Sequence, residues 1–411
     1  MKDNSNKQME PVHILESAED MEYLALTVQR ILGESCAVVQ SWEAESINPG
    51  QLNFTTSGIY RIHGAAAAGE ALRQWSFILK IIKPDSSEKE DVSYHNYWKR
   101  EAEIFTSGIL DHLPRRVVAP NCYAVQNRLN NTIALWMEDV AGYSERTHVW
   151  QLDDWSWVAE CLGEFHGAYL TETELPQHDW ICPAWLKSWV RGCRQYSPEI
   201  IEPCLERSGD DPAKGKERYP ELESNIHDQA YFIWRWFTKF SKQMDELLVS
   251  LERLPRVLSH QDLGQGNIFL PAERDHETLL TLIDWQFMSI SGIGEELGKL
   301  YGVNASLGHI AEKDFISAKE KLFERYIYGL RTAGWPGDER IARYGYCVGV
   351  AARSMWEVPQ WLKWVEELRS SSNQNHELFS KIAARTQIIS IQMDMAAEAV
   401  ALANTIFVAE K

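Results

Sequence analysis

Four polar residues, spaced over a loop and two short apolar runs, constrain the fold of this 411-residue chain more than any other feature. His260, Asp262 and Asn267 lie in the stretch LSHQDLGQGNIFL, and Asp284 directly follows the run LLTLI. The loop carries glycines and is too irregular to form one face of a helix. Each apolar run predicts a strand, and the charged segment between them predicts a turn. This hairpin places Asn267 beside Asp284, with Asp262 at the mouth of the loop.

The chemistry of these side chains suits phosphoryl transfer. An amide oxygen and a carboxylate side by side are hard ligands of the kind that hold magnesium under the phosphates of a nucleotide. A nearby carboxylate that does not bind the metal can accept the proton of an attacking hydroxyl. The alternative interpretation is structural: an aspartate that caps a turn, a histidine with satisfied hydrogen bonds, and a polar strand end. The combined spacing favours phosphoryl transfer.

The pattern His-x-Asp-x-x-x-x-Asn, followed by Ile-Asp, resembles the aminoglycoside phosphotransferase and choline kinase-like enzymes, which are small-molecule relatives of the protein kinases. The resemblance implies that Asp262 is the catalytic base and that Asn267 and Asp284 bind Mg2+. It further implies that His260 braces the loop. The match extends over most of the chain between residues 46 and 300, and its catalytic-loop and metal motifs are its specific part.

The resemblance to protein kinases themselves is weaker. Those enzymes usually carry Arg between the His and the Asp, Lys two residues after the Asp, and Phe-Gly after the metal-binding Asp. This chain has Gln261, Gly264 and Trp285-Gln286 at these positions. No Ala-Pro-Glu follows Asp284 either. These departures favour a small-molecule kinase over a protein kinase.

A lysine and a glutamate upstream form a second candidate pair. The segment WSFILKII predicts a strand with two apolar faces, interrupted by Lys80. A half-buried ammonium needs a carboxylate or a phosphate as its partner. A helix predicted over about Val92 to Ile109 carries Glu101 on its apolar stripe and Glu103 on its wet stripe. The resemblance implies that Lys80 holds the α- and β-phosphates and that Glu101 positions it; the alternative is a snorkelling lysine and a local glutamate pair.

The strand predicted for TIALWM is interpreted as the last one before a hinge. The resemblance implies that Met137 backs the adenine pocket and that the backbone of Glu138 and Val140 bonds the base. The alternative is an ordinary sheet strand that leaves into a turn. Residues 53–58 correspond to the loop that covers the phosphates in the family, although without a strict glycine fingerprint, and a plain hairpin loop fits them equally well.

The remaining elements are predicted from capping and periodicity. Ser17-Ala18-Glu19-Asp20 has the form of a capping box that opens a helix to about Leu32. The chain from Trp150 onward is mainly helical, and His166 is interpreted as a satisfied helix histidine rather than a ligand. After Asp284, either Glu295 or Glu296 matches the acidic residue that often braces the catalytic loop in the family. Further helices are predicted over about residues 153–170, 225–254, 312–331, 338–356 and 377–408, and a charged loop over 207–220.

Composition limits the class of protein. At 411 residues the chain is too long for one ordinary core, so two lobes are expected. A net charge of −18 argues against nucleic acid as a partner, because neutralising phosphates needs clustered Lys and Arg. Seven cysteines without a CxxC pair indicate neither a disulfide framework nor a zinc site. No signal peptide and no membrane span is recognised, so a cytoplasmic location is expected.

We therefore predict an α+β, bilobal, protein-kinase-like fold: a small sheet-rich N-lobe over residues 1–141 and a large, mainly helical C-lobe over residues 142–411. The predicted activity is an ATP- or GTP-dependent, Mg2+-assisted phosphotransferase that acts on a hydroxyl of a small molecule. A non-catalytic nucleotide-binding relative and, with less support, a protein kinase are the rival hypotheses. The acceptor and the oligomeric state are left open. The 17 tryptophans could stack on a substrate but are interpreted mainly as core residues.

Overall fold

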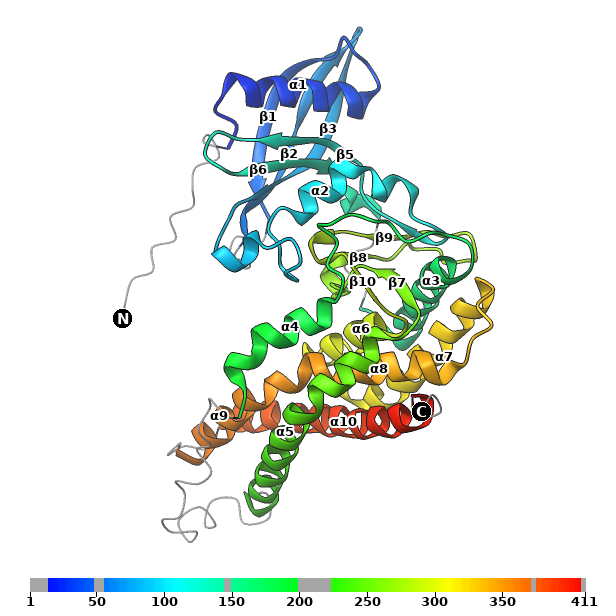
Figure 1. Ribbon diagram of the computed structural model, residues 1–411. Coiled ribbons are helices and arrows are strands. Elements are labelled where there is room, and N and C mark those ends of the chain that lie inside the picture. Colours follow the sequence, from blue (N-terminus) through cyan, green and yellow to red (C-terminus); the bar gives the residue numbers. More distant parts are fainter. Residues whose placement is uncertain (1–13, 48–54, 144–148, 199–222, 371–374, 408–411) are drawn as a thin grey trace.

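The computed structural model describes residues 14–47, 55–143, 149–198, 223–370 and 375–407. A sheet-rich N-terminal region is joined to a larger, mainly helical C-terminal region, and the two are stacked along one direction (Figure 1). The predicted fold class, α+β with a small sheet lobe and a large helical lobe, is confirmed. The start of the predicted phosphate-loop segment 53–58 and the predicted charged loop at 207–220 lie outside the described residues.

A five-stranded antiparallel sheet with the order β1-β2-β3-β6-β5 forms the N-lobe. Its central strands are long and apolar, and Phe77, Leu79 and Trp136 are fully buried between the sheet and helix α1. The strands are β1 (Val38–Ser46), β2 (Thr56–Ala68), β3 (Ala71–Ile82), β5 (Cys122–Asn127) and β6 (Ile133–Glu138). The sheet thus ends at Glu138, close to the predicted lobe boundary.

Helix α1 (Ala18–Leu32) lies across the sheet and begins where the capping box predicts. The Ser17 hydroxyl accepts a hydrogen bond from the Asp20 backbone N–H at 2.9 Å, and the Asp20 carboxylate accepts one from the Ser17 N–H at 3.1 Å. Asp20 also accepts hydrogen bonds from Gln126 and Arg128, which attach the start of the helix to the sheet.

Helix α2 (Arg100–Ser107) is shorter than predicted. It begins eight residues after Val92, where the prediction started it. The guanidinium of Arg100 is fully buried and donates to the backbone carbonyls of Val92, Tyr94 and His95. These carbonyls are therefore withdrawn from helical hydrogen bonding. Glu101 is buried, as its place on the apolar stripe predicts, and Glu103, placed on the wet stripe, is more exposed but still half-buried.

Short strands at the junction of the lobes flank residues 260–267, the predicted catalytic loop. β7 (Arg256–Ser259) precedes it and pairs with β10 (Ser289–Gly292). β8 (Ile268–Phe269) follows it and pairs antiparallel with β9 (Leu280–Leu282), which confirms the predicted hairpin. β4 (Val117–Val118) joins β9 from the N-terminal side.

The C-lobe is a stack of helices around one large apolar core. Helices α3 and α7 pack together, as do α6 and α8, and α10 runs along the far side of the stack (Figure 1). Trp185 and Trp361 are buried there, in agreement with a packing role for these rings. The helices are α3 (Leu152–Thr171), α4 (Trp185–Cys193), α5 (Glu223–Glu252), α6 (Glu295–Ser306), α7 (Phe315–Thr332), α8 (Glu339–Ser354), α9 (Val358–Ser370) and α10 (His376–Ile406).

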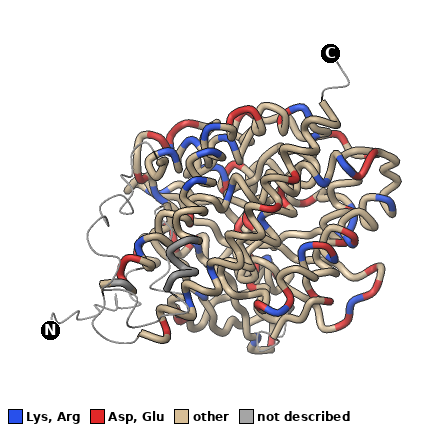
Figure 2. Tube along the Cα trace, turned by 90° about the horizontal axis from the view of Figure 1, so that it is seen from below, with Lys and Arg blue, Asp and Glu red and all other residues tan. Residues whose placement is uncertain are grey.

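Acidic and basic residues are interspersed along the described trace (Figure 2). In this view the acidic positions are distributed along the whole trace, with basic positions between them. No helix in the described part of the chain is long and apolar enough to cross a membrane.

Candidate active site

The β8–β9 hairpin brings Asn267 and Asp284 to the same end. Ile268 pairs with Leu282, and the Ile283 N–H donates to the Asn267 carbonyl at 3.0 Å. Asp284 follows immediately in a left-handed backbone conformation, with φ 64° and ψ 63°. Such a conformation is costly for a residue other than glycine and is often found at functional sites. The prediction that these two residues share one end of the hairpin is thus met by the strand register.

Asp262 lies at the mouth of the loop with a donor on each carboxylate oxygen. The Asn267 side-chain amide donates to Oδ2 at 3.1 Å and to the Asp262 carbonyl at 2.9 Å. The Lys299 ammonium is 2.8 Å from Oδ1. Burial is the largest single effect and would raise the pKa of Asp262, but the charge and hydrogen bond of Lys299, together with the nearby Arg353, lower it overall. The carboxylate is therefore ionised and fixed in direction.

His260 braces the loop from behind, as the resemblance implies. Its Nε2 lies 2.9 Å from the Ile283 carbonyl, and its Nδ1 accepts from the Asp262 N–H at 3.1 Å. Nδ1 is an acceptor, so the ring carries its proton on Nε2 and donates it to Ile283. The ring packs edge-on against Trp285, and burial lowers the pKa of His260. A neutral His260 thus ties the catalytic loop to the strand that ends at Asp284.

Gln261 holds the loop through all of its polar groups. It is completely buried and has φ 64°. Its backbone N–H donates to Glu296, and its side-chain amide donates to Glu295 at 3.0 Å. Its carbonyl and its side-chain oxygen both accept from Arg353. Both acidic residues between which the sequence left the choice open therefore contact the loop, Glu296 through the backbone and Glu295 through a side chain.

Lys80 links the two lobes. Its ammonium lies 2.6 Å from Glu101 Oε2, which belongs to the N-lobe, and 2.9 Å from Asp284 Oδ1, which belongs to the C-lobe. Burial by itself would lower the pKa of Lys80, but the charges of Asp284 and Glu101 raise it. Burial raises the pKa of Glu101 to about 7, against the effect of Lys80. The predicted Lys80–Glu101 pair is formed, and Lys80 has a third partner in Asp284, the predicted metal ligand.

The predicted hinge follows β6. Met137 is partly buried against the cluster between the sheet and α2, and the Glu138 N–H donates to the Asn121 carbonyl at 2.9 Å. Val140 is buried in the short turn that comes next. Asp139, which sequence reasoning did not select, accepts two hydrogen bonds from Arg61 of β2, at 2.7 and 3.3 Å. These contacts attach the connecting segment to the sheet.

The sequence analysis pointed to an acidic brace at Glu295 or Glu296 but did not select Lys299 and Asn304 of the same helix. On α6, Glu296, Lys299 and Asn304 all contact the catalytic loop, Asn304 through the Leu263 carbonyl at 2.8 Å and the Gln265 N–H at 3.1 Å. Polar residues in register on a helix with buried neighbours were the signal that could have identified them. His166 of α3 is buried between Tyr326 and Glu296, at 2.8 and 3.0 Å, in agreement with its interpretation as a satisfied histidine.

The donors at the hairpin end fit a magnesium–nucleotide site. Among the residues that the structure describes, no group of three His, Cys, Asp or Glu side chains could hold a metal ion by itself. Asn267 and Asp284 supply one amide oxygen and one carboxylate, and a magnesium ion in such a site keeps water and phosphate oxygens as its other ligands. The donor set is therefore that of a metal delivered with phosphates.

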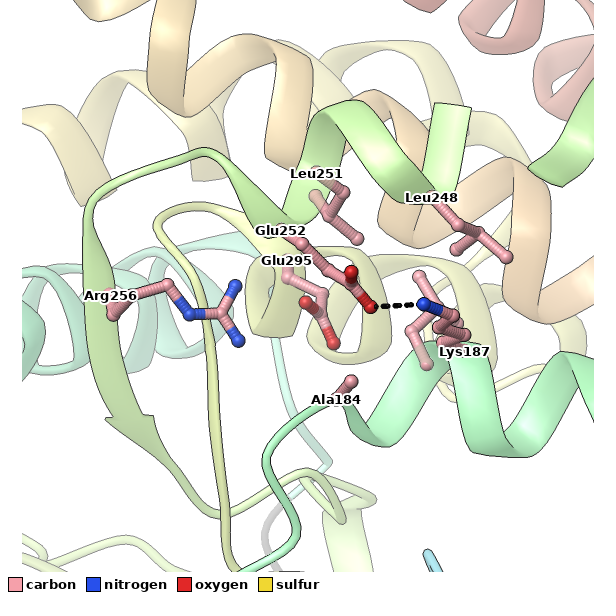
Figure 3. Close-up of a pocket in the computed structure, with 8 residues that line it drawn as sticks. Ala184, Lys187, Leu248, Leu251, Glu252, Arg256 and Glu295 are labelled. Atoms are coloured by element: carbon pink, nitrogen blue, oxygen red, sulfur yellow. Dashed lines mark hydrogen bonds and ion pairs between the residues drawn. The ribbon is translucent and has the colours of Figure 1, made fainter. Parts of the chain in front are cut away.

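A small, shallow hollow lies between α4, α5 and α6 (Figure 3). Glu295 lies beside the Glu252–Lys187 ion pair there, and Arg256 approaches from β7 (Figure 3). The lining contains none of Asp262, Asn267, Asp284 and Lys80. We therefore do not assign substrate binding to this hollow.

The family described as "Phosphotransferase enzyme family" matches residues 68–336, which is more than half of the chain. A comparison with curated proteins found no match.

Several solved structures show partial similarity at low sequence identity. A spectinomycin phosphotransferase in complex with ADP and spectinomycin is 14% identical, with 91% of this chain and 98% of that chain covered, at a TM-score of 0.46. An amicoumacin kinase in complex with AMP-PNP and Ca2+ is 11% identical, with coverages of 91% and 96%, at 0.46. A Plasmodium vivax ethanolamine kinase is 13% identical, with coverages of 93% and 90%, at 0.42.

Proposed function

This chain belongs to the phosphotransferase enzyme family, and we propose that it moves the γ-phosphoryl group of ATP or GTP to a hydroxyl of a small molecule. The observation that carries the proposal is the set of contacts among Lys80, Glu101, Asp284, Asn267 and Asp262. One buried ammonium joins the N-lobe to the metal-ligand carboxylate at 2.9 Å, and the metal-ligand amide bonds the candidate base at 3.1 Å. In the proposed site, the residue for the phosphates (Lys80), the residues for the metal (Asp284 and Asn267) and the residue for the acceptor (Asp262) are therefore neighbours, in that order.

In the proposed reaction the acceptor oxygen forms a bond to the γ-phosphorus, and the bond from that phosphorus to the β,γ-bridging oxygen breaks. The leaving nucleoside diphosphate keeps the electron pair, and the hydroxyl proton passes to Asp262. A carboxylate with a lowered pKa is adequate, because this transfer has a loose transition state in which the base mainly orients the hydroxyl. Most of the rate enhancement then comes from positioning and electrostatic stabilisation.

Asn267 and Asp284 would hold Mg2+, which would supply positive charge to neutralise the phosphates. Lys80 would hold the α- and β-phosphates, with Glu101 as its support. Met137, Glu138 and Val140 would receive the base of the nucleotide. Each of these roles is an expectation that combines the resemblance with the positions described above.

The experiment has to distinguish the proposed function from two rival functions. A non-catalytic relative would bind nucleotide without turnover, although the joint presence of Lys80, Asp262, Asn267 and Asp284 has no purpose in a scaffold. A protein kinase would phosphorylate generic protein substrates. The full burial of Gln261 at the position of the kinase Arg supports the small-molecule class, because this loop is held by internal partners.

The first test is release of ADP or GDP from ATP or GTP with magnesium, over a panel of hydroxylated metabolites, amino alcohols and antibiotics. Asp262→Asn keeps the size of the side chain and the hydrogen bonding of one oxygen but removes the base. We expect it to lower kcat by about 100-fold or more, with nucleotide affinity nearly unchanged. Asp394→Asn, on an exposed position of α10, is the matched control and should retain full activity.

The outcomes separate the hypotheses. Stimulation by one class of compound that is lost in Asp262→Asn supports the proposal and identifies the acceptor. Nucleotide binding without release in the presence of any acceptor favours the non-catalytic relative. An unchanged rate in Asp262→Asn excludes the assigned base, and absence of nucleotide binding excludes the kinase function.

A further inference from the structure

Lys299 is the one cation that touches the candidate base among the residues the structure describes. The side chain comes from the second turn of α6 and is 13% exposed, and that of Asp262 is 20% exposed. The pair is thus largely shielded but keeps an open side. Arg353, the other nearby cation, is fully engaged behind the loop with Gln261 and lies 4.0 Å from the ring of Trp185.

Stability alone is a poor reason for this arrangement. Burying an ammonium and a carboxylate costs several kcal/mol of desolvation per ion, and an apolar pair of similar volume is often as stable. Asn267 and His260 already fix Asp262 through its carboxylate and its backbone. The Lys299 ammonium is therefore not needed to orient Asp262, and what it adds there is positive charge.

The geometry of an in-line transfer shows what this charge can reach. The acceptor oxygen must lie about 3 Å from an Asp262 oxygen, and the phosphorus lies directly beyond it. An equatorial phosphoryl oxygen then comes within reach of a lysine that is already 2.8 Å from Oδ1. A lysine has three donors on a flexible stem, so one N–H can stay on Asp262 while another binds the phosphoryl group.

On the basis of the phosphotransferase function proposed above, we propose that Lys299 is a catalytic residue whose ammonium binds an equatorial oxygen of the γ-phosphoryl group during transfer. Lys80 then serves the α- and β-phosphates from the N-lobe, and Lys299 serves the transferred group from the C-lobe. The bonds made and broken are those given above, and Lys299 remains protonated throughout. Its ammonium stabilises the negative charge that is spread over the equatorial oxygens in the transition state.

The kinetic test compares Lys299→Met, Lys299→Arg and Lys363→Met. Methionine keeps the length of the stem without the charge, arginine keeps the charge, and Lys363 is an exposed lysine of α9 that serves as the control. We expect Lys299→Met to lower kcat by about 100-fold while KM for the nucleotide changes less than about threefold. Lys299→Arg should recover at least about tenfold of that loss, and Lys363→Met should match the wild type.

A second measurement distinguishes phosphoryl contact from mere support of Asp262. Magnesium, nucleoside diphosphate and aluminium fluoride together mimic the transferring group, and their affinity can be measured by calorimetry without any acceptor. In an Asp262→Asn background, Lys299→Met should still weaken this complex about tenfold and leave the affinity for the magnesium diphosphate unchanged. Retained diphosphate binding also shows that the variant is folded.

If Lys299→Met has no effect in that background, Lys299 acts only through Asp262 and the inference is wrong. If the wild type binds the diphosphate but gains no affinity from the fluoride, the inference is equally overturned, while nucleotide binding stands. If the wild type binds no nucleotide, the proposed function itself fails.

Discussion

At the scale of single residues, Gln261 explains why a departure from the protein kinase pattern is tolerated in this chain. Its left-handed backbone is held by Glu295, Glu296 and Arg353, which together engage four polar groups. Arginine at this position would face the guanidinium of Arg353 and lose the acceptor that Arg353 needs. The glutamine is thus part of a buried charge network.

Gln261→Ala should consequently be strongly destabilising. It removes the side-chain oxygen that accepts from Arg353 and the side-chain amide that donates to Glu295, both inside a buried charged network, so we expect a loss of about 3 kcal/mol or more in the free energy of unfolding. Urea unfolding measures this change, and Gln360→Ala, at an exposed position of α9, is the control with about 0.5 kcal/mol or less. An equal effect of the two substitutions would contradict the role assigned to the network.

The residues that could be identified from the sequence were those with a fixed spacing or an evident mismatch. Asp262, Asn267 and Asp284 share one hairpin, and Lys80 stands out in an apolar strand. Lys299 and Arg353 could not be found in this way, because they reach the loop from helices whose packing the local pattern does not specify. The roles of the predicted site residues stay predictions until they are measured.

At the scale of elements, the contact between α6 and α8 determines where Lys299 lies. A Cβ on Gly298 would come within 2.5 Å of the backbone of Gly349, whereas one on Gly302 would meet its nearest atom, in the Val350 side chain, at 3.5 Å. The two helices therefore approach backbone to backbone at Gly298 only because that residue has no side chain. One turn later the same helix has room for a methyl group.

Gly298→Ala and Gly302→Ala form a matched pair on one helix. The first should force α6 away from α8 and cost about 2–3 kcal/mol in the free energy of unfolding, together with a loss of activity. The second should be neutral or stabilise the protein by up to about 1 kcal/mol, because alanine is the better helix former. Thermal unfolding of both variants measures the difference, and equal stabilities would show that the close approach is not maintained in solution.

Elements with a local signal were predicted well and those without one were not. The capping box of Ser17 and the N-cap Asp338 place the starts of α1 and α8 correctly. The start of α2 was wrong because Arg100 binds distant carbonyls, which is a tertiary effect. The short strands β4, β7 and β10 were missed, since two to four residues carry no measurable periodicity.

At the scale of the whole molecule, the two lobes meet around a buried histidine as well as around Lys80. His95 precedes α2 and contacts Ser188 of α4, through its backbone N–H and its Nδ1, both at 3.0 Å. Burial and the charges of Arg100, Arg353 and Lys89 lower the pKa of His95 to about 3. The ring therefore stays neutral in the folded protein at pH values where a free histidine takes up a proton.

This neutrality makes the junction sensitive to acid. Between pH 6.5 and 3 the unfolded chain binds a proton at His95 that the folded chain does not, so stability falls as the pH falls. The slope contributed by this residue is at most about 1.4 kcal/mol per pH unit. His95→Gln removes that contribution, and its urea midpoint should therefore fall less than that of the wild type between pH 7.5 and 5.5. Parallel losses in both proteins would show that His95 is protonated in the folded state or is already exposed.

The contacts of α6 also bear on how this protein could be engineered. Glu295, Glu296, Lys299 and Asn304 bind the loop at Gln261, Asp262, Leu263 and Gln265. The loop and the helix thus form one set of complementary contacts, although about thirty residues separate them in the chain. A chimera that imports a foreign catalytic loop alone would place it against a helix that lacks the matching side chains. Transplanting residues 258–306 as a single cassette would preserve every one of these contacts.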